Sequence, residues 1–269
     1  MKKFILFLFA LAIVSFSCNK DDDDPTVVVN PTVVTADSLN PTQTQWGWTL
    51  EYTRTNCGSC GATGGPLLYD LLALGNVVGV AAHCAGSTDP MVTTIYQGFY
   101  SDRPSGGGIP SFWVGDEKVS TGGTDAVDEM NTLLGKTPCA GVDISFSISG
   151  NKMTVKTKSK FFSAETGDFL LSVYILEDGI DGSESSGLYN QSGAGVYTHR
   201  CVLRAASLDN VYGEALATNP ANDKVVEKTY EFTLDSEWTA ANCYPAAMIW
   251  KYDSSADPEH VFINAIKKK

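Results

Sequence analysis

The pattern of apolar and polar residues predicts alternating strands and helices between residues 44 and 136. The expected elements are, in chain order, a strand at TQWGWTLEYT, a helix at PLLYDLLAL, a buried strand at NVVGVAAH, a hairpin at SFWVGDEKV and a closing helix at DAVDEMNTLLG. The last helix is expected to end at Gly135. This alternation predicts an α/β domain over residues 44–136.

After a boundary near Lys136, Thr137 and Pro138, the chain changes to strand-like runs. These runs are DISFSISG, KMTVKTKSKFF, DFLLSVYILED, VYTHRCVLRAA, KTYEFTL, YPAAMIWKYD and HVFINAIKK. Loops rich in Gly, Asn, Asp and Ser separate them, which favours a β-sandwich over a helical arrangement. We therefore predict an all-β, immunoglobulin-like sandwich domain over residues 139–269.

Residues 1–18 have the plan of a secretory signal peptide. Two lysines precede the apolar run FILFLFALAIV, and small residues follow, ending in SFSC. The run is too short for a transmembrane helix. A cysteine directly after Ser17 is typical of lipoprotein signals, so we expect Cys18 to be acylated and to become the new amino terminus. The alternative is an ordinary signal peptide with an incidental cysteine.

Residues 19–43 show no sustained period and are interpreted as a tether. They begin with NKDDDD, which resembles the acidic export tag that sends some bacterial lipoproteins to the outer face of the outer membrane. A solvated acidic linker is compatible with the same role, because like charges repel and keep the tether extended. We expect a lipid-anchored protein on the outer membrane that faces the exterior.

Amino-acid composition narrows the classes of molecule that the protein is expected to bind. The formal net charge is −12, and the cationic run at Lys267–Lys269 is too short for a nucleic-acid surface, so no nucleic-acid partner is expected. No further apolar run is long enough to cross a bilayer, so membrane attachment depends on the lipid. Setting Cys18 aside leaves six of the seven cysteines, an even number that favours disulfides in an oxidising compartment.

The segment EYTRTNCGSC, read with GIPSFWVG, carries the candidate chemistry. A Cys-X-X-Cys pair after a strand predicts a redox site in which Cys57 attacks and Cys60 resolves. Glu51 is a candidate proton acceptor if it is buried, and otherwise an exposed edge-strand glutamate. Ile109 and Pro110 are expected to form a cis peptide bond facing the cysteines, with a plain loop proline as the alternative.

These segments resemble the thioredoxin superfamily, with EYTRTNCGSC at the cysteine segment and GIPSFWV at the cis-proline loop. Two features depart from its pattern: Asn56 stands where active members usually carry tryptophan, and GATGGP follows Cys60. Each interior glycine costs about 1 kcal/mol relative to alanine, so a frayed first helical turn is expected.

Over nearly the whole mature chain, the order of signal, acidic tether, EYTRTNCGSC, NVVGVAAHC, GIPSFWVG, YTHRCVLRAA and EWTAANC is similar to the outer-membrane-protein-twenty-eight-related family. The resemblance implies a thioredoxin-like domain followed by a β-sandwich, a lipid anchor in the outer membrane, and no established substrate.

The other cysteines and histidines leave alternatives open. His83 and Cys84 end a predicted strand. The carboxyl ends of parallel strands lie at one edge of a sheet, and Cys57 and Cys60 are expected at the same edge. The four side chains are therefore weak candidates for a zinc or copper site. In the favoured interpretation Cys84 pairs elsewhere and His83 is a loop residue, with no metal and no cofactor. For the three cysteines of the second half, either one pairs with Cys84 or two thiols stay free. Those three are Cys139, Cys201 and Cys243.

Two hypotheses for function follow. The first is a thiol-disulfide oxidoreductase that acts on protein or peptide cysteines at the cell envelope. The second is a non-catalytic binding or adhesion lipoprotein, in which the CGSC disulfide only stabilises the fold and the sandwich presents a surface to an unknown ligand. Metal binding by cysteine and histidine is a further alternative.

Overall fold

The structure is a computed structural model that describes residues 38–84, 89–122, 124–182, 191 and 198–269. The signal peptide, Cys18 and the acidic run of the tether lie outside these residues. The described residues all belong to one compact unit. None of the described helices has the length and apolar character needed to cross a membrane.

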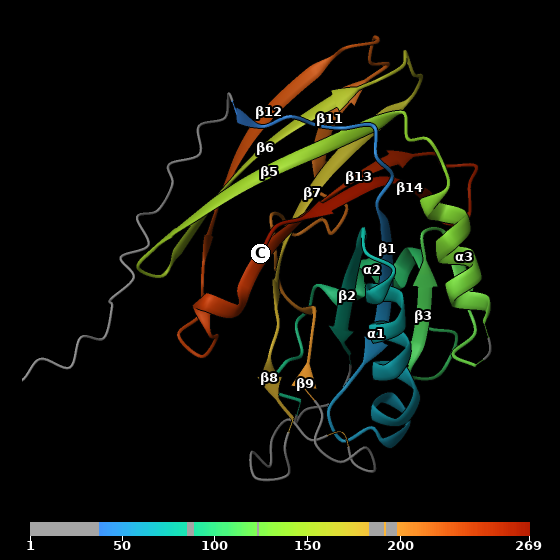
Figure 1. Ribbon diagram of the computed structural model, residues 1–269, viewed down its shortest axis with the longest axis vertical. Coiled ribbons are helices and arrows are strands. Elements are labelled where there is room, and N and C mark those ends of the chain that lie inside the picture. Colours follow the sequence, from blue (N-terminus) through green and yellow to red (C-terminus); the bar gives the residue numbers. More distant parts are fainter. Residues whose placement is uncertain (1–37, 85–88, 123, 183–190, 192–197) are drawn as a thin grey trace, which may run out of the picture. The chain divides into compact units, whose positions relative to one another are not determined.

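Within the described residues, a mixed sheet of nine strands takes members from both halves of the chain (Figure 1). Eight strands follow the order β14-β13-β7-β10-β2-β1-β3-β4, and β11 pairs with β7. Their bounds are β1 Gly47–Thr53, β2 Val77–His83, β3 Ser111–Val114, β4 Glu117–Val119, β7 Asp168–Glu177, β10 Val202–Ala206, β11 Glu214–Thr218, β13 Cys243–Tyr252 and β14 His260–Lys267. The β-rich character expected for the second half is confirmed.

In the first half, β1 and β2 run parallel, β3 pairs antiparallel with β1, and β4 pairs antiparallel with β3. A π-helical segment, η2 (Cys60–Gly64), leads into α1 (Gly65–Ala73), and α3 (Asp125–Leu134) closes this half. These elements coincide with the predicted ones. Helix α2 (Tyr96–Asp102) has no counterpart among the elements expected from the sequence, although Ile95 and Phe99 have the spacing of an apolar helix face.

In the second half, a three-stranded antiparallel sheet packs over part of the large sheet. It consists of β5 (Ala140–Ser149), β6 (Lys152–Phe161) and β12 (Val225–Thr233). A second core of buried side chains lies between it and strands β7 and β13. A short pair, β8 (Ile180–Asp181) with β9 (Thr198–His199), completes the described strands.

The large sheet does not stop at the boundary predicted near Pro138. Strand β10 pairs in parallel with β2 at Val202 and Ala81, and the Ala81 amide donates to the Cys201 carbonyl at 2.8 Å. Strand patterning predicts that a segment is extended, but every strand offers the same backbone donors and acceptors. The partner of each strand is therefore decided by long-range packing, which the local pattern does not contain.

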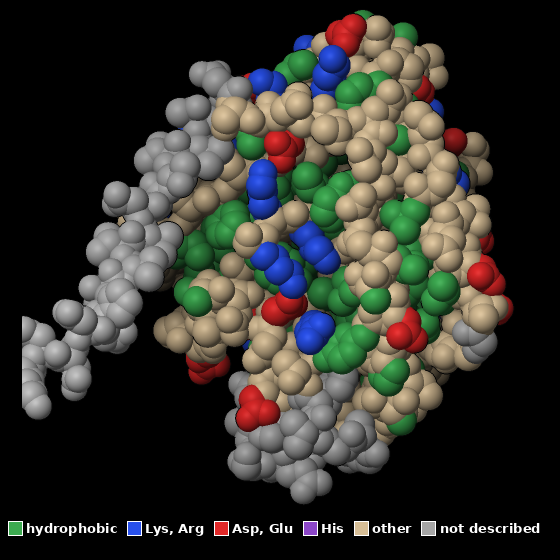
Figure 2. Space-filling model, in the orientation of Figure 1, with side chains coloured by type: hydrophobic (Ala, Val, Ile, Leu, Met, Phe, Trp, Pro, Cys, Tyr) green, Lys and Arg blue, Asp and Glu red, His purple; other side chains and the backbone are tan. Residues whose placement is uncertain are grey.

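The carboxyl terminus is docked onto the molecule through its lysines. It lies near the middle of the face drawn in Figure 1, where Figure 2 shows Lys and Arg side chains gathered among acidic ones. Lys267 donates to the Val77 carbonyl at 2.7 Å, Lys268 pairs with Asp143 at 3.2 Å, and Lys269 pairs with Asp178. The last strand is thus tied to both halves of the chain.

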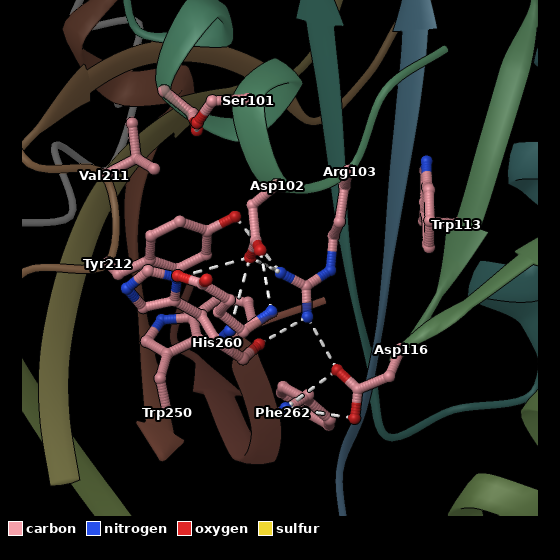
Figure 3. Close-up of polar contacts among 12 residues, drawn as sticks. Ser101, Asp102, Arg103, Trp113, Asp116, Val211, Tyr212, Trp250, His260 and Phe262 are labelled. Carbon is pink, nitrogen blue, oxygen red and sulfur yellow. Dashed lines mark hydrogen bonds and ion pairs between the residues drawn. The ribbon is translucent and has the colours of Figure 1, made fainter. Parts of the chain in front are cut away.

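A buried arginine at the end of α2 ties the first half to β14 (Figure 3). Arg103 is 0% exposed. Its Nη1 donates to Asp102 at 2.9 Å, and its Nη2 donates to Asp116 at 2.6 Å and to the His260 carbonyl at 2.5 Å. The two carboxylates also accept backbone N–H groups from Glu259 and Phe262.

Aromatic rings enclose the same guanidinium. Its carbon lies 5.1 Å from the ring centroid of Trp250, 5.5 Å from Trp48 and 5.7 Å from Tyr212. These distances are within the range of cation–π attraction. Burial by itself would raise the pKa of Asp102, but the His260 and Tyr212 side chains and Arg103 hold it at about 2. The cluster therefore keeps opposite charges paired inside the protein.

We expect Arg103→Met to lower the free energy of unfolding by about 2–4 kcal/mol, since it leaves two partly buried carboxylates without their cation. Urea denaturation followed by tryptophan fluorescence measures the change. Lys228→Met is the control, because Lys228 pairs with Glu214 at 2.9 Å near the surface and its loss should cost less than about 1 kcal/mol. Equal losses in the two variants would contradict the role assigned to Arg103.

Candidate functional site

The cysteine motif and the Ile-Pro loop meet at one edge of the large sheet. Cys57 follows the carboxyl end of β1, and Pro110 directly precedes β3, whose Ser111 pairs with Tyr52 of β1. The Ile109–Pro110 peptide bond is cis, as predicted. The structure thus brings the segments EYTRTNCGSC and GIPSFWVG together.

The two cysteines form a disulfide with unequal exposure. Their sulfur atoms are 2.04 Å apart, and Cys57 is 7% exposed while Cys60 is 0% exposed. The Cys60 amide donates to Cys57 Sγ at 3.2 Å, and Ser59 Oγ lies 3.5 Å from the same sulfur. Hydrogen bonds of this kind favour negative charge on a sulfur, so Cys57 is better placed than Cys60 to be a thiolate.

Asn56 has a conformational role in the turn before Cys57. Its φ is 57°, in the left-handed region that asparagine tolerates better than most residues with a side chain. A tryptophan at this position would be strained. The departure from the usual thioredoxin pattern at this residue therefore follows from the local backbone.

The frayed turn expected after Cys60 is not found. The chain is helical from Gly58 to Ala73, and its central part is the π-helical segment η2. A Cβ placed on Gly64 would lie 2.5 Å from Glu51 Oε1 and 2.9 Å from Pro110 Cβ. Glycine is thus required where the helix packs against the sheet and the Ile-Pro loop. Tertiary packing outweighs the weak helix propensity of GATGGP.

Glu51 is buried beneath this helix. It is 2% exposed, and its Oε1 has no hydrogen-bond partner. Burial raises the pKa of Glu51 to about 8, although the Thr53 side chain pulls it down. Gly64 contacts this carboxyl one turn after Cys60, so Glu51 lies on the side of the helix where Cys60 is buried. A carboxyl in such a position can exchange a proton near neutral pH.

Glu51 should make stability depend on pH. Below pH 4.5 it is neutral in both states; between 4.5 and about 8 only the unfolded chain loses the proton. The free energy of unfolding should therefore fall by about 1.4 kcal/mol per pH unit across that window and change no further above it. In urea denaturation experiments, the free energy of unfolding of the wild type should fall relative to that of Glu51→Gln as the pH rises from 5 to 8. A constant difference from pH 5 to 9 would contradict a buried, neutral Glu51.

His83 and Cys84 take part in local hydrogen bonds. His83 Nδ1 lies 2.8 Å from Asp89 Oδ2, and the same carboxylate accepts the Thr55 amide at 2.8 Å. The Cys84 thiol points to the Thr53 carbonyl at 3.5 Å, and burial raises its pKa to about 11. Among the described residues, no group of three or more His, Cys, Asp or Glu side chains is arranged to hold a metal ion.

The remaining thiols of the described chain are not joined by disulfides, so the further bridges expected from the even cysteine count are wrong for this structure. They belong to different parts of the interior: Cys84 to the core of the first half, Cys139 and Cys243 to the second core, and Cys201 beside Tyr244 at 3.3 Å. An even number of cysteines does not place pairs at bonding distance.

Comparison with known proteins shows the fold. No protein-family model matches the chain, and no curated protein sequence matches it. Among solved structures, HBP35 of Porphyromonas gingivalis is similar with a TM-score of 0.68 and 18% identity, over 85% of this chain and 76% of its own. At that identity the likeness shows a shared fold alone.

Two further structures are similar over about half of the chain. A domain of the outer membrane lipoprotein Omp28 from Porphyromonas gingivalis has a TM-score of 0.32 and 17% identity, over 49% of this chain and 88% of its own. A DUF3823 family protein from Bacteroides ovatus has a TM-score of 0.27 and 20% identity, over 48% of this chain and 55% of its own. With such low TM-scores, neither likeness carries an argument about this protein.

Proposed function

We propose that the protein is a lipid-anchored thiol-disulfide oxidoreductase of the outer membrane, with a thioredoxin-like first half that acts on protein or peptide cysteines. The observation that carries the proposal is the arrangement around the disulfide. Cys57 lies nearer the surface, Cys60 is buried, the Glu51 carboxyl with its unpaired Oε1 lies under the helix, and Pro110 approaches the helix at the same residue, Gly64.

The order of elements supports the thioredoxin-like interpretation. A strand leads into the cysteine motif, the motif opens a helix, a second parallel strand follows, and a cis proline precedes an antiparallel strand. In this arrangement the first cysteine lies at the start of the helix, where backbone N–H groups stabilise a thiolate.

In the proposed exchange reaction, Cys57, Cys60 and Glu51 have separate roles. In the reduced protein, the Cys57 thiolate attacks a substrate disulfide, forms a mixed disulfide and releases one substrate thiolate. Cys60 then gives its proton to ionised Glu51 and attacks Cys57 Sγ, which releases the second substrate thiolate and forms the Cys57–Cys60 disulfide. Two electrons pass from the protein to the substrate. In the reverse direction the disulfide form oxidises a substrate dithiol, and Glu51 returns the proton to Cys60.

The location is proposed from the amino-terminal sequence. A charged start, an apolar run, small residues and then Cys18 fit a lipoprotein signal, and the four aspartates that follow fit export to the outer surface. Two fatty acyl chains or more bind a bilayer stably without a transmembrane helix. The proposed substrates are therefore cysteine-containing proteins or peptides at the cell envelope or outside it.

We expect Cys18→Ala to abolish lipid attachment, because no other residue offers the acylated thiol. Metabolic labelling with a radioactive fatty acid, followed by membrane fractionation, measures it. Ser17→Ala is the matched control, since it keeps a small residue before Cys18 and should still be labelled. A Cys18→Ala protein that carries lipid and sediments with membranes would overturn the anchor.

A specific observation favours a second function. Cys57 itself is only 7% exposed, so the disulfide also fits a structural bridge that stabilises the start of the helix. In that case the protein would be a binding or adhesion lipoprotein, and the surface of the second half would carry the recognition site.

Trapping of mixed disulfides distinguishes the two functions. Cys60→Ser should accumulate mixed disulfides through Cys57, because the attacking thiol remains while the resolving one is gone. Cys57→Ser is the matched control and should trap none. Non-reducing electrophoresis and mass spectrometry of the adducts measure the outcome. Equal trapping by both variants, or by neither, would favour the binding lipoprotein.

A further inference from the structure

A cavity of about 450 Å³ opens beside the Ile-Pro loop. It lies between the carboxyl ends of β1 and β2, helix α2 and the loop before β3. The residues that define its chemistry are Arg54, Cys84, Tyr96, Tyr100, Ser105 and Ile109. Its volume falls within the range of about 300–1,000 Å³ that is usual for ligand pockets. None of these residues takes part in a step of the proposed exchange reaction.

The wall of this cavity is mainly apolar and held in place. Tyr100 is 41% exposed, yet its ring packs edge-on against Tyr52 with centroids 5.6 Å apart, and Ser105 Oγ lies 3.2 Å from its hydroxyl. Cys84 is turned toward the Thr53 carbonyl. Its raised pKa keeps the thiol protonated, so Cys84 acts as an apolar wall. A rigid aromatic wall binds an apolar group at a low cost in conformational entropy.

Arg54 adds a positive charge to this cavity. Its side chain is exposed and forms no ion pair within the described part of the chain. The protein has a formal net charge of −12, so Arg54 places a positive charge at this cavity in a molecule that is negative overall. A cation at the edge of a low-dielectric cavity attracts anions and repels cations.

Ile109 connects the cavity to the cysteines. Ser59, which lies between Cys57 and Cys60 in the sequence, donates its hydroxyl to the Ile109 carbonyl at 3.4 Å and lies 3.5 Å from Cys57 Sγ. The same Ile109 lines the cavity. An extended peptide advances about 3.3 Å per residue, so a chain bound at Cys57 reaches the cavity within a few residues.

We propose that this cavity is a specificity pocket for peptide substrates that carry an aromatic or large aliphatic side chain next to a carboxylate, close to the reacting cysteine. The apolar side chain lies against Tyr96 and Tyr100, and the carboxylate pairs with Arg54. This inference rests on the proposed exchange function, which it extends by naming the class of substrate.

The kinetic test uses the full mature chain with Cys60→Ser and short peptides whose cysteine forms a mixed disulfide with 2-mercaptoethanol. The peptides carry Phe-Glu, Phe-Lys, Gly-Glu or Gly-Lys beside the cysteine. Phe-Glu should react about ten-fold faster than Phe-Lys, as expected for a charged pair at the edge of a pocket. When Arg54→Gln is added, the ratio of the Phe-Glu rate to the Phe-Lys rate should fall to the ratio of the Gly-Glu rate to the Gly-Lys rate. Arg54→Lys should keep most of the preference for Phe-Glu.

Two more variants provide the controls. Tyr100→Ala should slow the Phe peptides toward the Gly peptides, while Tyr100→Phe should not. Lys156→Gln removes a charge from β6, outside the cavity, and should leave every ratio as in the parent. The pocket is refuted if the ratio of the Phe-Glu rate to the Phe-Lys rate is the same in Arg54→Gln as in the parent. It is also refuted if Lys156→Gln lowers this rate ratio as much as Arg54→Gln does.

A binding test separates failure of the pocket from failure of the exchange function. It uses the redox-inert double variant Cys57→Ser, Cys60→Ser and the same peptides with serine in place of cysteine and an uncharged fluorophore. Fluorescence anisotropy should show tighter binding of Phe-Glu than of Phe-Lys, and Arg54→Gln should abolish the difference. If the double variant discriminates while the Cys60→Ser chain reacts with no peptide, the pocket stands and the exchange function fails. If the double variant does not discriminate, the pocket is overturned whatever the kinetics show.

Discussion

The enclosure of the Arg103 guanidinium is the constraint on which the arrangement of the two halves depends. A buried cation must be neutralised, and Asp102 and Asp116 do this, while the His260 carbonyl accepts a further hydrogen bond from the guanidinium. The two carboxylates also accept N–H groups from Glu259, just before β14, and from Phe262 in β14. The same charges that neutralise the arginine thus fix the end of α2, the turn between β3 and β4 and the last strand of the sheet with respect to one another.

Strand β1 separates two buried ionisable centres with different properties. Trp48 and Tyr52 point to the side of the Arg103 cluster, where charges are paired, and Glu51 points to the opposite side, where an oxygen has no partner. Paired buried charges fit a structural role. A buried acid with one unpaired oxygen and a pKa raised to about 8 has a cost in stability that a structural role does not explain and that proton transfer would explain.

The unusual residues around the cysteines are explained by close packing. Asn56 supplies a left-handed backbone conformation, and Gly64 allows the helix to approach Glu51 and Pro110. Neither residue is favourable by helix propensity or by likeness to the usual thioredoxin pattern. Both bring the disulfide, the carboxyl and the Ile-Pro loop into a small space, with the pocket at Arg54 and Tyr100 along the same edge of the sheet.

The sequence by itself determined the local features. Hydrophobic periodicity predicted β1, α1, β2, α3 and the strands of the second half other than β8 and β11, and the spacing of Cys57, Cys60 and Pro110 predicted a site that the structure brings together. These features depend on neighbours along the chain, through backbone conformation and the direction of side chains.

Only the tertiary structure decided the pairing of β10 with β2, the burial of Arg103 and the separation of Cys84, Cys139, Cys201 and Cys243. It also decided that GATGGP is helical and that Arg54, Tyr96 and Tyr100 share a cavity. Strand pairing, charge burial and cavity walls are made by residues far apart in the sequence. Their free energy depends on desolvation and packing between segments, which no local pattern records.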